Sequence, residues 1–286
     1  MDMAKTRKFD FKSDTRDISG AVAFLFVEDN HWLFETLEHL SQIGFQRIYA
    51  ISPEPFAEFE TFPKVRWIEA PFTRNDAAIR LINSAQDALL GRWVYTCYNG
   101  EFLHFPFDET RKIDDFTAFL EEERKVSAMN LKMDIYPARA LDQLTELKVT
   151  QCWFDKIGYF SSRGRDANGH AHDQMLEVRG GFRWRMADFL PQDSMILNRS
   201  LLFRMNANAK LGPNFRFDSP EYEYAHAQWH NSPTTVTASL RAYKYLRELP
   251  EAENTIAQLK YSGSSPYQKR GQQFMELGFM EPGQWF

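Results

Sequence analysis

The most informative stretch of the chain reads Trp93-Val94-Tyr95-Thr96-Cys97-Tyr98-Asn99-Gly100-Glu101-Phe102-Leu103. Its first five residues are apolar or β-prone, which is typical of a buried strand. A break that contains Gly100 follows, and the apolar pattern resumes after a single acidic residue, Glu101. Because open α/β sheets bind ligands at the carboxyl ends of their strands, we expect residues 98–101 to lie at a functional edge.

Strands and helices alternate on the N-terminal side of this stretch. Apolar positions from Trp32 to Ile43 recur at helical spacing, and Gly44 follows them as a C-cap. Such alternation predicts an α/β fold with a mostly parallel central sheet. The predicted strands of this sheet lie near 21–27, 47–52, 65–70 and 93–97.

Beyond the stretch, we predict a polar helix near 114–125 and a further strand at 127–134. The polar, glycine-containing segment 161–169 is predicted to be a mobile loop. Residues 1–18 are interpreted as a polar N-terminal arm. Residues 19–286 are interpreted as a single α/β domain with C-terminal helices from about 246 to 286.

Composition narrows the class of protein. With 286 residues and 43% hydrophobic residues, the chain is long and apolar enough for a buried core. Its net charge of -5 gives no general attraction to nucleic acid. The two cysteines, Cys97 and Cys152, lie in apolar contexts and are expected to be buried thiols. No signal peptide or transmembrane segment is recognised, so we expect a cytoplasmic protein.

Several segments, taken in order, resemble bacterial glycosyltransferases of the family 2-like group, which have the Rossmann-like glycosyltransferase-A fold. The similar segments are Val27-Glu28-Asp29-Asn30-His31-Trp32-Leu33, Gly44-Phe45-Gln46-Arg47-Ile48-Tyr49, Glu101-Phe102-Leu103, Arg179-Gly180-Gly181-Phe182-Arg183-Trp184-Arg185 and Leu240-Arg241-Ala242-Tyr243-Lys244-Tyr245-Leu246. The resemblance implies transfer of a sugar from a nucleotide-sugar donor to a hydroxyl of a glycan acceptor, in the synthesis of a cell-surface polysaccharide or glycoconjugate.

The family's metal-binding motif, Asp-x-Asp, is degenerate in this chain. Its two aspartate slots read Tyr98 and Gly100, and only Glu101 remains as an acid. The resemblance implies a divalent cofactor, Mn or Mg, with Glu101 and more weakly His226 as ligands, although this set is incomplete. Two interpretations stay open: an active glycosyltransferase, or a catalytically degenerate homologue that binds nucleotide or glycan or acts as a scaffold.

Four residues at predicted strand ends are candidates for nucleotide or diphosphate binding: Glu28, Ser52, Tyr98 and Glu101. Glu28 is the candidate for the base or ribose, while Asp29 or Asn30 is expected to cap the following helix. Glu101 is also a catalytic candidate, with a structural acid as the alternative.

Three arginines around a Gly-Gly pair, Arg179, Arg183 and Arg185, could carry the diphosphate charge in place of a metal. In an extended segment Arg183 and Arg185 would share one face. The alternative is that these arginines form ordinary ion pairs with Asp188 or Glu177. Asp173 is the nearest carboxylate for a catalytic base that activates the acceptor hydroxyl, with a solvated loop residue as its alternative.

Overall fold

The computed structural model describes residues 9–71, 75–138, 147–165, 168–207, 209–217, 219, 222, 232–255 and 258–285. The chain divides into two compact units. The first unit comprises Met1–Asn99, Lys112–Ser127 and Ser200–Glu223, and the second comprises Gly100–Arg111, Ala128–Arg199 and Tyr224–Phe286.

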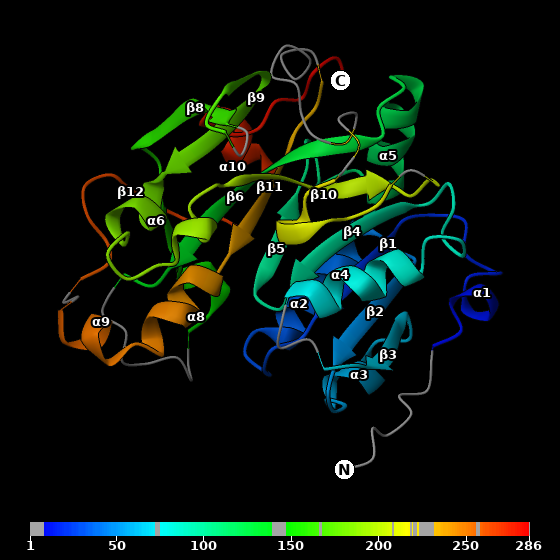
Figure 1. The fold of residues 1–286 in the computed structure, drawn as a ribbon. Helices are drawn as coiled ribbons and strands as arrows, with labels where there is room; N and C mark the ends of the chain where they lie inside the picture. Colours follow the sequence, from blue (N-terminus) through cyan, green and yellow to red (C-terminus); the bar gives the residue numbers. More distant parts are fainter. Residues whose placement is uncertain are drawn as a thin grey trace. The chain divides into compact units, whose positions relative to one another are not determined.

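The first unit is built on parallel strands in the order β3-β2-β1-β4, with β10 antiparallel to β4 (Figure 1). Phe26 pairs with Ile51 on one side and with Tyr98 on the other, so these three strands end together. The strands are β1 (Val22–Phe26), β2 (Arg47–Ser52), β3 (Val65–Glu69), β4 (Trp93–Tyr98) and β10 (Asn198–Arg204).

The helices of the first unit connect these strands. Gly44 ends α2 in the left-handed conformation, as predicted. The predicted N-cap of α2 by Asp29 or Asn30 is wrong, because Trp32 stands at that position with φ 55° and no capping side chain. The helices are α1 (Phe11–Asp14), α2 (Leu33–Ile43), α3 (Glu58–Thr61), α4 (Asn75–Ser84), α5 (Ile113–Glu122) and the 3-10 turn η3 (Pro213–Phe215).

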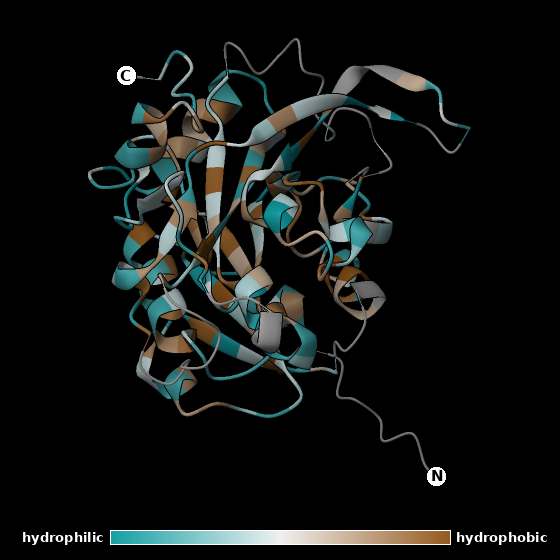
Figure 2. Ribbon diagram, turned by 90° about the vertical axis from the view of Figure 1, so that its left-hand side faces the viewer, coloured by the Kyte–Doolittle hydropathy of each residue, from teal (hydrophilic) through white to brown (hydrophobic). Residues whose placement is uncertain are grey.

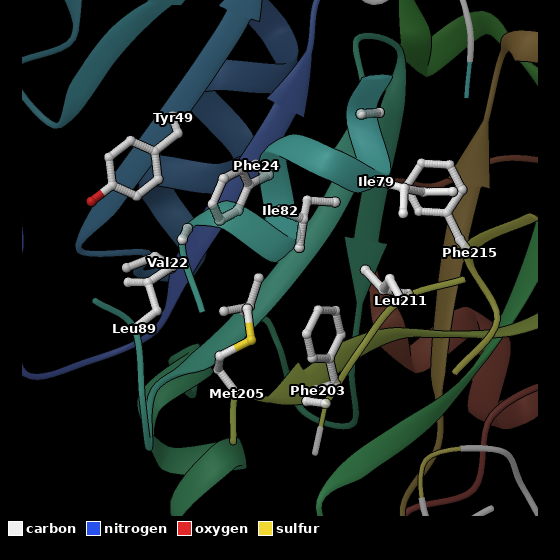
Figure 3. Packing of buried hydrophobic residues seen from close by; sticks show 14 of the residues in the cluster. Val22, Phe24, Tyr49, Ile79, Ile82, Leu89, Phe203, Met205, Leu211 and Phe215 are labelled. Carbon is white, nitrogen blue, oxygen red and sulfur yellow. The ribbon is translucent and has the colours of Figure 1, made fainter. Parts of the chain in front are cut away.

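A continuous hydrophobic core covers one face of this sheet (Figure 3). Alternate residues of β1, Val22 and Phe24, belong to it together with Ile79 and Ile82 of α4. Burying a side chain of this size contributes about 1.5–3 kcal/mol. Apolar residues of the first strands and of α4 therefore form most of the core. Segments later in the chain complete it with Phe203, Met205, Leu211 and Phe215.

The described part of the N-terminal arm is docked on the first unit. Asp14 accepts hydrogen bonds from Tyr49 Oη at 3.1 Å and from Arg66 Nε at 3.1 Å. Arg47 Nε lies 3.3 Å from the same carboxylate. Phe11 packs edge-on against Tyr49, with ring centroids 5.2 Å apart. The polar arm predicted for residues 1–18 therefore has an apolar and ionic anchor at residues 11–14.

The second unit contains a mixed sheet in the order β5-β11-β6-β7-β12, in which only β11 and β6 are parallel. A separate antiparallel pair, β8-β9, forms a ribbon (Figure 1). The strands are β5 (Glu101–His104), β6 (Ser127–Tyr136), β7 (Trp153–Asp155), β8 (Tyr159–Arg165), β9 (Ala171–Gly180), β11 (Thr235–Ser239) and β12 (Ser264–Pro266).

The helices of the second unit are short. They are η1 (Val149–Gln151), α6 (Gly181–Arg185), η2 (Gln192–Ser194), α8 (Arg241–Arg247), α9 (Pro250–Thr255) and α10 (Gly271–Glu276). The C-terminal region predicted as helical from about 246 also contains strand β12.

The predicted fold class, α/β with a parallel central sheet, is confirmed by these strands. The central strands carry brown, hydrophobic segments, while the helices alternate hydrophobic and hydrophilic ones (Figure 2). The mobile loop predicted for 161–169 is wrong for its first five residues, which pair with β9 as part of β8. Among the described residues, no helix is long and apolar enough to span a membrane. The single domain over 19–286 stays a prediction.

Candidate functional site

The parallel sheet of the first unit has a topological switch point between β1 and β4. The chain runs from β1 to β2 and β3 on one side, and then returns to add β4 on the other side of β1. Connections that leave in opposite directions open a crevice at the carboxyl ends of the two strands, where open α/β sheets bind their ligands. Here those ends are Phe26 and Tyr98, which pair directly.

Asn99, directly after β4, ties the two strand ends together. Its buried side chain donates from Nδ2 to Asp29 Oδ1 at 2.8 Å, to Asp29 O at 3.0 Å and to His31 O at 2.9 Å. Its Oδ1 accepts from the Glu28 amide at 2.9 Å. Residues 28–31 are thus fixed at the switch point by one neutral side chain, whose hydrogen bonds are fully formed inside the protein.

The fixed loop presents an acid to solvent. Glu28 is exposed, whereas the half-buried Asp29 accepts a hydrogen bond from the His31 amide at 2.8 Å. Asp29 therefore organises the loop internally, and Glu28 is the exposed acid of the loop. An exposed carboxylate at such a strand end can accept hydrogen bonds from ribose hydroxyls.

Ser52 and Tyr98, also predicted to contact the nucleotide, lie at this edge but make internal contacts. The buried Ser52 hydroxyl donates to Glu54 O at 2.5 Å and accepts from Trp67 Nε1 at 3.0 Å. The half-buried Tyr98 ring packs against Phe26, with centroids 5.4 Å apart. Both residues therefore shape the edge.

Glu101 belongs to the second unit and starts β5, where it is buried. Its Oε1 accepts from Lys132 Nζ of β6 at 2.6 Å and from Ser239 Oγ of β11 at 3.0 Å. The preceding Gly100 has φ 82°, a conformation that glycine adopts readily and residues with a side chain adopt rarely. The backbone there thus favours glycine at position 100.

Lys132 lies in an environment that disfavours its charge. Burial lowers the pKa of its ammonium, and the nearby guanidinium groups of Arg241 and Arg183 lower it further. The Glu101 carboxylate opposes these effects. An additional anion beside this ammonium would raise its pKa, because a nearby negative charge favours the charged form.

The three candidate arginines of the Arg-Gly-Gly segment all form ion pairs. Arg179 pairs with Glu177 at 2.9 Å, as the alternative interpretation predicted. Arg183 is buried and binds Asp134 with two hydrogen bonds, at 2.7 and 3.0 Å.

Arg185 likewise forms a bidentate pair with Asp155, with hydrogen bonds of 2.8 and 3.0 Å. Its Cζ lies 4.5 Å from the centroid of the Tyr261 ring. Bidentate pairs of this kind hold both side chains in place. Their role in diphosphate binding stays a prediction.

The backbone of this segment differs from the expected one. Residues 181–185 form α6, so the extended segment in which Arg183 and Arg185 would share one face is not present. Gly180, with φ 130°, allows the turn into α6, and a Cβ atom there would lie 2.1 Å from the Gly158 carbonyl oxygen. The Gly-Gly pair is thus required by its close approach to the start of β8.

Two further candidates are described in part or not at all. Asp173 lies on β9 rather than in a loop, and its side chain falls outside the described residues. His226 also falls outside the described residues.

The residues around Glu101 do not fit a divalent cation. The described part of the chain holds no group of three or more His, Cys, Asp or Glu side chains arranged for a metal. The one acid left in the motif has an ammonium 2.6 Å away, which would repel a second cation.

Comparison with known proteins gives only distant likenesses. No protein-family model matches the chain, and no curated protein matches it. A 2-C-methyl-D-erythritol 4-phosphate cytidylyltransferase from Francisella tularensis is 11% identical, with a TM-score of 0.30 over 67% of this chain and 75% of its own. The UTP-bound UGPase of Acinetobacter baumannii is also 11% identical, with a TM-score of 0.32 over 91% and 98%.

A third structure, a putative glucose-1-phosphate thymidylyltransferase from Bacillus anthracis, is 8% identical with a TM-score of 0.29, over 83% of this chain and 79% of its own. These proteins are nucleotidyltransferases or a pyrophosphorylase rather than family 2 glycosyltransferases. At such TM-scores the likeness decides neither fold nor function, so the site has to be argued from its own geometry.

Sequence reasoning overlooked two residues that organise these edges. Asn99 stands inside the motif stretch, and its place between a strand end and a glycine was a signal for a turn-fixing amide. Lys132 interrupts the apolar strand 127–134, and a charge within a buried strand indicates a partner. Its partner Glu101 could not be identified from spacing, because β11 lies between their strands.

Proposed function

We propose that the first unit binds a nucleoside phosphate at the carboxyl ends of β1 and β4, and that the protein is a transferase using a nucleotide-sugar donor. The observation that carries this proposal is the Asn99 side chain, whose four hydrogen bonds fix residues 28–31 at the switch point of a parallel sheet. In this proposal Glu28 binds the ribose, and the glycan hydroxyl is the acceptor, as the family resemblance implies.

A second function is favoured by the surroundings of Glu101. Its carboxylate is held by Lys132 and Ser239, and the acids expected of a metal-dependent glycosyltransferase are replaced by Tyr98 and Gly100. A degenerate homologue that binds a nucleotide sugar or glycan without turnover is consistent with this arrangement. Binding and turnover therefore need separate tests.

The binding test is calorimetry with a panel of nucleoside diphosphates, with and without manganese. We expect at least one to bind, and Glu28→Ala to weaken that binding about tenfold, the size of one hydrogen bond to a charged group. Glu122→Ala, which removes an exposed acid from α5 of the same unit, is the matched control and should leave affinity unchanged. Equal affinities for the two variants would refute the role of Glu28.

Turnover is tested by incubating the protein with the nucleotide sugars of whichever nucleotide binds and measuring release of the nucleoside diphosphate. Release that depends on an added glycan supports the transferase. Binding without release supports the degenerate homologue. Failure of every nucleotide to bind, under both metal conditions, overturns the nucleotide site itself.

A further inference from the structure

Lys132 of the second unit has donor capacity left over. An ammonium carries three N–H donors, and its partner among the described residues is the Glu101 carboxylate. The lysine side chain keeps 17% of its surface exposed, whereas Glu101 keeps 1%. The exposed part of the pair therefore belongs to the lysine and not to the acid.

Two guanidinium groups, those of Arg183 and Arg241, act on this ammonium and disfavour its charged form, while the Glu101 carboxylate favours it. Asp134, the nearest other acid on β6, is occupied by two hydrogen bonds from Arg183. An oxyanion beside Lys132 would relieve the repulsion among these cations and accept hydrogen bonds from the ammonium.

The cluster also lies where a ligand is expected. Ser239 of β11 pairs with Glu101 on one side and with Asp134 on the other, so three strands bring these residues to one edge. That edge is the carboxyl end of the parallel pair β6 and β11, the end at which α/β sheets bind ligands. Lys132 lies two residues before Asp134 on β6 and therefore projects on the same face of its strand.

We propose that Lys132 binds an oxyanion of a phosphate or diphosphate group at this edge, without a divalent metal. Glu101 and Ser239 fix the ammonium, while Arg183 and Arg241 supply additional positive charge. A lysine ammonium thus neutralises the phosphate charge where the residues do not fit a metal. This subsite is defined within the second unit and does not depend on the nucleotide site proposed for the first.

The test is calorimetric titration of the full-length protein with inorganic pyrophosphate in buffer containing EDTA. We expect the unaltered protein to bind, and Lys132→Met to bind at least tenfold more weakly, because a charge-assisted contact is lost. Lys156→Met is the matched control, since Lys156 is an exposed lysine after β7 of the same unit. Its affinity should equal that of the unaltered protein.

A second variant keeps the test decisive if Lys132→Met does not fold. Arg241 is half-exposed, and Arg241→Gln should fold and weaken pyrophosphate several-fold. No binding by the folded, unaltered protein in EDTA would overturn the proposal. If Lys132→Met folds, an affinity for pyrophosphate equal to that of the unaltered protein and of Lys156→Met would also overturn it. If Lys132→Met is unfolded, an Arg241→Gln variant that binds pyrophosphate as tightly as the unaltered protein would overturn it.

The nucleotide site can be separated from this subsite with a nucleoside that lacks phosphate. Binding of the nucleoside that is weakened by Glu28→Ala and not by Lys132→Met reports the first unit. Binding of pyrophosphate that is weakened by Lys132→Met and not by Glu28→Ala reports the subsite in the second unit.

Discussion

The strand ends of the two units follow each other in the sequence at Asn99-Gly100-Glu101, yet different forces organise them. In the first unit a neutral amide fixes a loop through four hydrogen bonds. In the second unit a buried acid, Glu101, is held by an ammonium and a hydroxyl, beside the ion pair of Arg183 and Asp134. The first arrangement contains no ion pair among these contacts, whereas the second is built on ion pairs.

This difference bears on how the segment Tyr98-Asn99-Gly100-Glu101 can serve a site. It carries one acid, Glu101, and the ammonium of Lys132 lies 2.6 Å from that carboxylate. The edge of the first unit keeps its geometry because Asn99 holds it without any cation. The two edges can therefore be perturbed separately, and the chain provides one buried cysteine in each unit, Cys97 and Cys152, as a reporter.

The largest effect is expected from Arg183→Ala in the ionic edge. Removing one partner of a buried ion pair leaves Asp134 as an uncompensated charge, which costs about 3–5 kcal/mol. Denaturant unfolding measures the loss, and labelling of Cys152 should accelerate because the second unit opens more often. A loss below 1 kcal/mol would show that water solvates Asp134 and that this edge is not a closed ionic cluster.

Asn99→Ala tests the neutral edge and should cost less, about 2–3 kcal/mol. The side chain makes four hydrogen bonds of modest net value, and its removal leaves the Glu28 amide without its partner. Cys97 lies two residues before Asn99 on β4. The rate at which a thiol reagent labels Cys97 should therefore rise more than the rate for Cys152. If both cysteines accelerate equally, the units unfold together and the proposed separation of the two edges is wrong.

The strands of the first unit could be predicted, because the local pattern of apolar and polar residues defines them. The strands near 21–27, 47–52, 65–70 and 93–97 were predictable because each is an apolar run bounded by polar or turn residues. Residues 161–165 were not, because their serine, glycine and arginine content resembles a loop and only pairing with β9 makes them a strand.

The site was less predictable than the sheet. Glu28 and Glu101 were identified from their positions at strand ends, but Asp29 was expected to cap α2, and the structure ties it to Asn99 instead. The partner of Glu101 depends on β11 lying between β5 and β6, a long-range arrangement that spacing along the chain does not reveal.

A third prediction uses pH to sharpen the contrast within the second unit. Burial raises the pKa of the Cys152 thiol from 9.0 to about 12. Between these values the unfolded chain releases a proton that the folded protein keeps, so the thiol's contribution to stability falls as pH rises.

At pH 10 this loss amounts to about 1.4 kcal/mol, one pH unit above the unfolded pKa. Cys152→Ala should therefore be less sensitive to pH than the unaltered protein when unfolding is measured between pH 8 and 10. Parallel curves for the two proteins would mean that the thiolate is solvated in the folded state.

The smallest effect is expected from Arg179→Ala, which separates the exposed end of the Arg-Gly-Gly segment from its buried part. Arg179 keeps 31% of its side chain exposed and pairs with Glu177 two residues away. Solvent screens such a pair, so its loss should change the free energy of unfolding by about 0–1 kcal/mol, and less at high salt. Nucleoside diphosphate affinity then decides its role. If Arg179→Ala leaves unfolding unchanged but weakens the diphosphate more than the free nucleoside, Arg179 contacts phosphate. If both ligands bind as before, Arg179 acts only through its pair with Glu177.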